Sequence, residues 1–180
     1  MNVVIFGDRF SFPEGNAATN RVHTYAKGLI ENGINVNVVC FESRYNSAGN
    51  GQINQINYYY PFGQIQRNKY FVVRRFYKFL KYVKTIGLLR RLNREDKTIA
   101  IYIYTNLLLT HLFSWLLAKM TRSKLIIEGN EHPLRHFQAN AFRKTVGLIK
   151  FYIEAYFSDG IFCISHYLVD FHKSKGISEK

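Results

Sequence analysis

Cysteine is scarce in this 180-residue chain, which contains only Cys40 and Cys163. They do not form a C-x-x-C pair, so the ligand spacing of a common zinc site is missing. Each ends an apolar, strand-like run, which predicts buried and reduced thiols in a cytosolic protein. A disulfide between the two is the alternative, although nothing else in the sequence indicates an oxidising compartment.

We also expect no secretory leader in this sequence. Residues 1–8 carry no basic segment, and their apolar run is too short for a signal peptide. We therefore expect a cytoplasmic protein. Hydrophobic residues make up 47% of the chain and aromatic residues 16%, which argues against disorder and for one folded domain over residues 1–180.

No apolar run is long enough and clean enough to be read as a membrane span. Residues 99–118 come nearest, but polar side chains interrupt them at Thr105, Asn106, Thr110, His111 and Ser114. The first part is β-branched and aromatic, and the second part has helical character. A strand over 99–104 followed by a helix over 107–119 fits this segment better than a transmembrane helix.

The glycine fingerprints of nucleotide-binding loops are absent. The chain contains neither G-x-G-x-x-G nor G-x-x-x-x-G-K-[ST]. Glu42 is the nearest acidic residue to the end of the second strand, but it does not stand where a ribose-binding carboxylate is expected. A nicotinamide-dependent enzyme is therefore disfavoured.

Acidic residues are few, at 12 against 25 Lys and Arg, and the imbalance is local. Residues 67–97 hold 11 of the basic residues and 2 of the acidic ones. A helical pattern over 67–94 places Phe76, Phe79, Leu80 and Val83 on one side. Basic residues occupy its other sides: Arg74, Arg75, Lys78, Lys81 and Lys84. This pattern favours contact with an anionic membrane surface. A core-packed helix with a solvated basic side is the alternative, and nucleic acid is disfavoured because no recognition motif accompanies the charge.

Elsewhere, strands alternate with helices. Strands are predicted over 3–6, 35–41, 53–60 (near a sheet edge), 99–104, 124–128 and 161–164. Further helices are predicted over 16–31, 141–157 and 165–173. The helix over 141–157 has its apolar positions at Phe142, Val146, Ile149, Ile153 and Tyr156. This alternation predicts an α/β fold with a doubly wound, mostly parallel, Rossmann-like sheet flanked by helices.

The turn between the first strand and first helix, residues 12–21, organises the chain. We expect Gly15 to use its freedom at positive φ and to let a ligand approach the backbone. Asn16 is a good N-cap, and Ala17 keeps the first helical turn thin. The unpaired amides of such a turn would seat a phosphate. An ordinary strand-to-helix turn is the alternative.

Ligands of such a sheet lie at the carboxyl ends of its strands. The segments 8–16, 41–46, 105–106 and 128–136 converge there. They bring Glu131, His132 and Arg135 near the helix that Gly15 and Asn16 open. His132 could hydrogen-bond a sugar hydroxyl and a carboxylate could orient or deprotonate one, whereas a surface-loop histidine is the alternative. His23, His111 and His166 lie in helical patterns and are interpreted as packing or surface residues.

Several motifs together resemble the amino-terminal domain of family 4 glycosyltransferases. They are Phe6-Gly7, the turn over residues 13–22, the helix over 25–33, Glu128-Gly129-Asn130-Glu131-His132-Pro133-Leu134 and the segment over 159–165. The resemblance covers essentially the whole chain. It implies one half of a GT-B fold, in which two Rossmann-like domains face each other. It also implies sugar transfer from a nucleotide-sugar with retention of configuration, no metal, and no cofactor beyond that donor substrate.

The resemblance also implies residue roles. Gly15, Asn16 and Ala17 would approach the donor diphosphate, and His132 with Glu131 would lie near the transferred sugar. From their place at the carboxyl ends of the strands, Thr105, Asn106 and Arg135 are expected to bind the acceptor or the sugar. The basic helix would match the membrane-facing surface of relatives that act on lipid-linked acceptors. The donor-binding carboxy-terminal domain, with its paired glutamates, is not in this chain, so we expect a truncated domain that is inactive alone.

These observations predict the acceptor-side half of a cytoplasmic glycosyltransferase. Its partners would be a nucleotide-sugar, a glycan or lipid-linked acceptor, the missing carboxy-terminal domain and the inner face of the cell membrane, but no nucleic acid. The alternative is a non-catalytic membrane-docking or assembly module that uses the basic helix 67–94.

Overall fold

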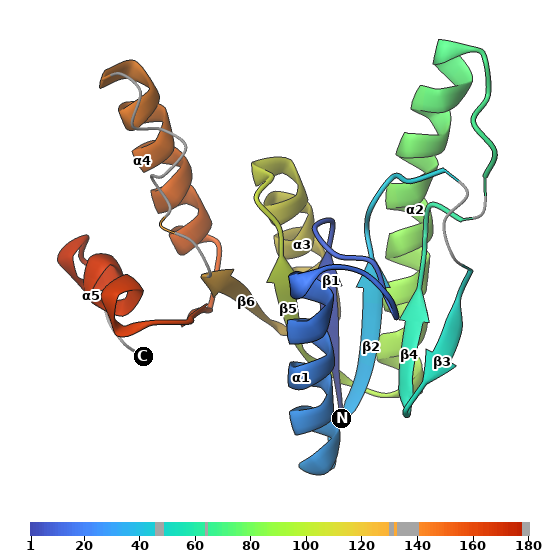
Figure 1. Cartoon of the computed structure of the whole chain (residues 1–180), viewed down its shortest axis with the longest axis horizontal. Helices are drawn as coiled ribbons and strands as arrows, with labels where there is room; N and C mark the ends of the chain where they lie inside the picture. The colour runs from blue at the N-terminus through green and yellow to red at the C-terminus, as the bar shows by residue number, and fades with distance from the viewer. Residues whose placement is uncertain (46–48, 64, 130–131, 133–140, 178–180) are drawn as a thin grey trace.

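The chain folds around one seven-stranded sheet with helices on both faces (Figure 1). The structure is a computed structural model that describes residues 1–45, 49–63, 65–129, 132 and 141–177. The strands are β1 (Asn2–Gly7), β2 (Asn35–Cys40), β3 (Gly51–Ile53), β4 (Ile56–Tyr59), β5 (Thr98–Tyr104), β6 (Lys124–Gly129) and β7 (Gly160–Cys163). The helices are α1 (Ala17–Glu31), α2 (Phe71–Glu95), α3 (Leu108–Thr121), α4 (Ala141–Tyr156) and α5 (His166–Ser174).

The strand order is β3-β4-β2-β1-β5-β6-β7, and every neighbouring pair is parallel except β3 and β4. The predicted α/β fold with a doubly wound, mostly parallel sheet is confirmed. The single strand predicted over 53–60 is a hairpin instead. Its two turn residues, Asn54 and Gln55, both adopt positive φ, as a tight turn between twisted strands requires. The edge strand at this side is β3.

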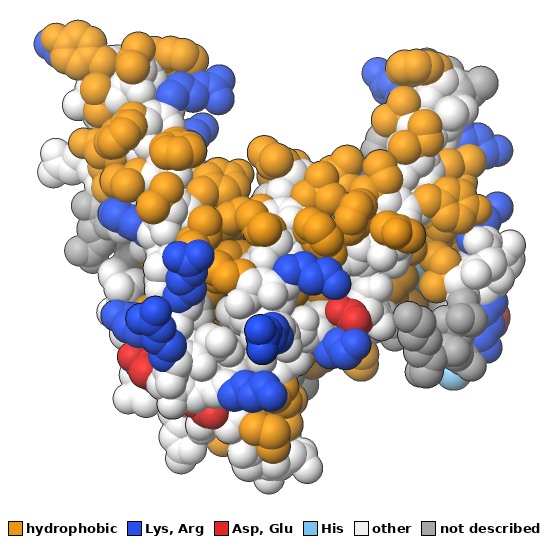
Figure 2. All heavy atoms as spheres, turned by 180° about the vertical axis from the view of Figure 1, so that it is seen from behind, with side chains coloured by type: hydrophobic (Ala, Val, Ile, Leu, Met, Phe, Trp, Pro, Cys, Tyr) orange, Lys and Arg blue, Asp and Glu red, His pale blue; other side chains and the backbone are white. Residues whose placement is uncertain are grey.

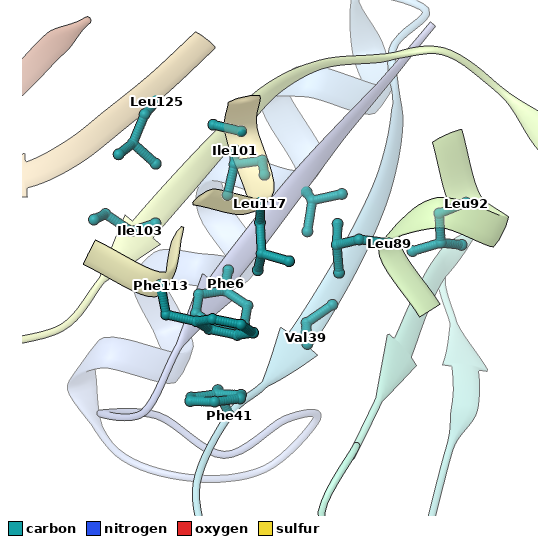
Figure 3. Packing of buried hydrophobic residues seen from close by; sticks show 12 residues of the cluster. Phe6, Val39, Phe41, Leu89, Leu92, Ile101, Ile103, Phe113, Leu117 and Leu125 are labelled. Carbon is teal, nitrogen blue, oxygen red and sulfur yellow. The ribbon is translucent and has the colours of Figure 1, made fainter. Parts of the chain in front are cut away.

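Alternation along the central strands separates two cores. On one face, Ile5 and Val38 pack with Val22 and Ala26 of α1. On the other face, Phe6 of β1 packs with Phe113 of α3 and with Phe41, which follows β2. Leu89 of α2 belongs to the same cluster (Figure 3). Helix α1 therefore covers one face of the sheet, and α2 and α3 cover the other.

Helix α2 packs on the sheet through a side that is partly polar. Its buried residues are Lys81, Thr85, Leu89 and Leu92, whereas the predicted apolar side is open, with Phe76 57% and Phe79 65% exposed. Helix α4 behaves similarly: the predicted apolar positions Phe142 and Tyr156 are exposed, and Phe151 is the buried side chain. Within the described residues, none of the helices is long and apolar enough to cross a membrane.

The two cysteines are free. Cys40 is buried beneath α1, and Cys163 at the end of β7 is half-buried. Burial raises the pKa of the Cys40 thiol to about 12, so this side chain is an inert part of the core. The prediction of buried thiols is confirmed for Cys40, whereas Cys163 is less buried than expected.

Candidate functional site

The carboxyl edge of the sheet has a switch point between β1 and β5. The chain leaves β1 over α1 toward β2 on one side, and it reaches β5 on the other side of β1 only after α2 has crossed the sheet (Figure 1). In sheets of this kind, the loops that diverge from neighbouring parallel strands at such a point form the crevice in which ligands bind. Asp8 follows β1, and Thr105 and Asn106 follow β5, so both loops belong to this crevice.

The turn before α1 is built as a helix cap. The side-chain oxygen of Asn16 accepts hydrogen bonds from the amides of Ala18 at 3.0 Å and Thr19 at 3.4 Å. The predicted N-cap is therefore confirmed. Because the cap already satisfies two of the first amides of α1, fewer donors remain for a phosphate than the sequence predicts. Gly15, Asn16 and Ala17 are themselves exposed to solvent.

The reason for glycine at position 15 differs from the prediction. Gly15 does not have positive φ; that conformation occurs at Gly33, Gly63 and Gly176. A Cβ at position 15 would instead overlap Oγ1 of Thr19 and lie 3.1 Å from the carbonyl oxygen of Ser11. The Thr19 hydroxyl donates to that same carbonyl at 2.7 Å, which ties the turn to α1. Glycine is needed here for close packing of the turn.

The loops after β1 and β5 are joined through Asn106. With its amide oriented to satisfy both partners, Asn106 accepts from Nη2 of Arg9 at 3.0 Å and donates to the carbonyl of Thr105 at 3.2 Å. The Thr105 hydroxyl accepts from the Leu107 amide at 3.1 Å, at the start of α3. The Thr105 hydroxyl is therefore already engaged in a backbone hydrogen bond. Asn106 is exposed at the switch point between β1 and β5.

His132 contacts α5 in the structure. Its ring centroid is 4.3 Å from that of Phe171 and 5.9 Å from that of Tyr167. The sequence predicted this histidine beside the start of α1, and no described contact joins the two. Glu131 and Arg135 lie outside the described residues. His111, interpreted as a packing residue, is fully buried and shares a hydrogen bond of 3.2 Å with Ser158.

Sequence reasoning missed a buried carboxylate at the end of β6. The side chain of Glu128 is 1% exposed, and its Oε1 accepts from Nη1 of Arg21 at 3.4 Å and from the Tyr25 hydroxyl at 3.3 Å. Its Oε2 is buried without a partner among the described residues. Burial raises the pKa of Glu128 and raises that of Tyr25 to about 12. A carboxylate at the end of an otherwise apolar strand was the available signal, but its partners on α1 are more than 100 positions away in the sequence.

A second missed cluster lies on the opposite face, below the loops after β1 and β2. Lys81 is 6% exposed, and its Nζ donates to the carbonyl of Phe41 and to Oγ of Ser43, both at 2.9 Å. Burial lowers its pKa to about 8, against a raising effect of Asp8. Asp8 accepts from the Thr110 hydroxyl at 3.0 Å and leaves Oδ1 buried without a partner among the described residues. The prediction of Lys81 as a membrane-facing residue is therefore wrong.

The other predicted membrane-facing residues do reach the surface. Arg75, Lys78 and Lys84 are exposed, and Arg74 is half-buried. A hollow of about 290 Å³ near the amino-terminal end of α2 is lined by basic and aromatic side chains: Tyr45, Arg67, Phe71, Arg74, Arg75 and Lys78. Because none of these described lining residues is acidic, the hollow is suited to an anionic group.

Among the described residues, no group of three His, Cys, Asp or Glu side chains gathers where a metal ion could be held. Comparison with models of known protein families finds no match, and no curated protein is significantly similar to this chain.

Proposed function

We propose that this chain is the acceptor-side, amino-terminal half of a metal-independent, retaining glycosyltransferase that works at the inner face of the cell membrane. The observation that carries the proposal is the switch point between β1 and β5 at the carboxyl edge of the sheet. The capped start of α1 and the Arg9–Asn106 contact lie at the same edge of the sheet. The family resemblance of the sequence adds the substrate class.

In this proposal the donor diphosphate meets the exposed turn of Gly15, Asn16 and Ala17, where the positive end of the α1 dipole favours an anion. Arg21, half-exposed one turn further along α1, adds a cation. Asn106, Thr105 and Arg135 position the acceptor, and His132 hydrogen-bonds a hydroxyl of the transferred sugar.

The transfer forms a bond from the acceptor oxygen to the anomeric carbon. The bond from that carbon to the diphosphate breaks, and the diphosphate leaves with the electron pair. Glu131 takes the acceptor proton. The other domain of the complete enzyme would hold most of the nucleotide-sugar, so positioning of the acceptor is the main contribution of this half.

The test uses the protein encoded by the complete gene, incubated with labelled nucleotide-sugars and a lipid or glycan extract. Transfer of label into the extract supports the proposal, and a His132→Ala variant should lose most of it. Unchanged turnover in that variant removes His132 from the reaction. No transfer from any uridine-, guanosine- or thymidine-linked sugar contradicts the proposal.

A non-catalytic membrane-docking module is the second candidate, favoured by the open apolar side of α2. Phe76 and Phe79 stand in solvent beside Arg75 and Lys78, and the basic hollow lies at the same end of the helix. Both candidates predict salt-sensitive binding to anionic vesicles. Sugar transfer by the complete protein separates them, because only the first candidate predicts it.

A further inference from the structure

An apolar band crosses the face of the molecule formed by α2, α3 and α4 (Figure 2). On α2 it consists of Val72, Phe76, Phe79 and Val83, which are between 50% and 75% exposed. Their spacing of four, three and four residues places them on one side of the helix. Leu109 and Leu116 of α3, 68% and 51% exposed, continue the band between the two flanking helices.

Helix α4 repeats the pattern of α2. Phe142, Val146 and Ile149 are 77%, 41% and 55% exposed, and their spacing again gives one stripe. Both helices project at their amino-terminal halves beyond the rest of the fold, on either side of α3 (Figure 1). The carboxy-terminal half of each helix packs on the rest of the fold. In α2, Leu89 and Leu92 are buried. In α4, the ring of Phe151 packs against that of Phe171 of α5, with 5.6 Å between the ring centres.

Basic residues accompany the apolar stripe at both tips. Arg75 and Lys78 lie beside the stripe of α2, and exposed Arg143 and Lys144 follow Phe142 on α4. The three helices together contain two acidic residues, Glu95 and Glu154. Both lie near the carboxy-terminal ends of their helices and pair with Arg91 and Lys150 of the same helix. The amino-terminal halves of α2 and α4 are therefore apolar and basic, and neither helical half contains an acidic residue.

We infer that α4 is a second membrane-contacting helix, and that α2 and α4 together seat the domain on an anionic bilayer with the carboxyl edge of the sheet turned toward it. A contiguous apolar surface of this extent is unusual on a monomer. Aromatic and aliphatic side chains flanked by Lys and Arg are typical of helices that lie in the interface of a bilayer. A second copy of the chain is a poor occupant, because it would bring like charges together at both tips.

This inference extends the docking surface proposed above and does not depend on the transferase. The inference fixes how the domain is oriented on the bilayer. Contact through α2 alone would leave the domain free to tilt. Contact through α2 and α4, which lie on either side of α3, would hold it at two separate places. The amino-terminal ends of α2 and α4 both lie toward the carboxyl edge of the sheet. A lipid-linked molecule would therefore reach the β1/β5 switch point directly from the bilayer.

The test is sedimentation of the protein with vesicles of phosphatidylcholine mixed with phosphatidylglycerol, and with vesicles of phosphatidylcholine alone. We expect binding to the mixed vesicles only. A Phe142→Ser/Val146→Ser variant should bind these vesicles at least about tenfold more weakly, and so should Phe76→Ser/Phe79→Ser. Each change removes two apolar side chains that would insert into the lipid when the protein binds. All four side chains are exposed, so circular dichroism should be unchanged.

Tyr156→Ser is the matched control, since this residue is 83% exposed at the opposite end of α4. It should bind within about twofold of the unmodified protein, because a side chain away from the interface gains nothing from lipid. Normal binding by the α4 variant, with loss in the α2 variant, overturns the inference and leaves docking through α2 intact. No binding by the unmodified protein overturns both. A dimer that the α4 substitutions dissociate would assign the face to a second copy and also overturn the inference. Sugar transfer is measured separately and bears on neither result.

Discussion

The guanidinium of Arg21 lies 3.4 Å from a carboxylate oxygen of Glu128, across 107 positions of the chain. The carboxylate is buried, while the Arg21 side chain is 38% exposed. The pair therefore fixes a partly accessible cation of α1 against the end of β6, at the edge of the sheet where we place the ligand.

Removal of Arg21 should destabilise the fold. An Arg21→Met variant leaves the buried Glu128 carboxylate with the Tyr25 hydroxyl alone, which should lower the free energy of unfolding by about 1–3 kcal/mol. Glu128→Gln should cost less, because a neutral amide is cheaper to bury. Urea denaturation of both variants measures the difference. Lys27→Met, which breaks the exposed Lys27–Glu31 pair, is the control and should change stability by less than about 0.5 kcal/mol. An Arg21→Met cost no larger than this control would contradict the role of the pair.

Gly15 should not tolerate a side chain. Gly15→Ala places its Cβ against Thr19 and the Ser11 carbonyl, which should cost about 1–3 kcal/mol of unfolding free energy. Gly28→Ala in α1 meets nothing within 4 Å and should stabilise the protein by about 0.5–1 kcal/mol. Adding Thr19→Ala to Gly15→Ala should recover part of the loss, which a double-mutant cycle would measure. Equal effects of the two glycine substitutions would show that position 15 is not sterically restricted.

His111 should make stability depend on pH. Burial lowers its folded pKa from 6.5 to about 4, so the unfolded chain binds a proton that the folded chain refuses. This contribution to stability is complete above pH 6.5 and is lost as the pH falls toward 4, by up to about 3 kcal/mol. His111→Gln should flatten this part of the pH profile in denaturant titrations. A profile unchanged by His111→Gln would mean that folding does not lower the pKa of His111.

Lys81 and Lys84 should differ at a membrane. Lys84 is exposed, whereas Nζ of Lys81 is bound to Phe41 and Ser43. Lys84→Gln should weaken binding to anionic vesicles about fivefold, since a lysine near such a surface contributes about 1 kcal/mol. Lys81→Met should bind unchanged, provided that circular dichroism shows it folded. Weakening by Lys81→Met as strong as that of Lys84→Gln would place Lys81 at the surface after all.

The β1–α1–β2 unit was predictable because its signals are local. An apolar strand, the Asn16 cap and the apolar stripe of α1 each act within a few residues. The β3–β4 hairpin was missed because its turn consists of Asn54 and Gln55, of which Gln55 carries no turn preference. The parallel order of the sheet followed from the alternation of strands and helices.

The orientation of α2 was not predictable from helical periodicity. Its aromatic residues form the apolar side of the periodic pattern, but contact with the sheet begins at Lys81 and Thr85, further along the helix. A lysine can take a core position because its stem packs on apolar surface, here with Nζ 3.7 Å from the centre of the Phe41 ring. The Arg21–Glu128 pair was missed for a related reason: the two residues meet only through tertiary packing.

If the start of α1 receives the diphosphate of a nucleotide-sugar, it should also bind inorganic pyrophosphate. Titration of isotope-labelled protein with pyrophosphate, followed through the backbone amide resonances, measures this binding. The amides of Ala17 and Arg21 should shift and saturate, and they should do so equally in an Arg75→Gln/Lys78→Gln variant that weakens the basic hollow on α2. Shifts confined to α2, or lost altogether in that variant, would contradict a diphosphate site at the carboxyl edge of the sheet.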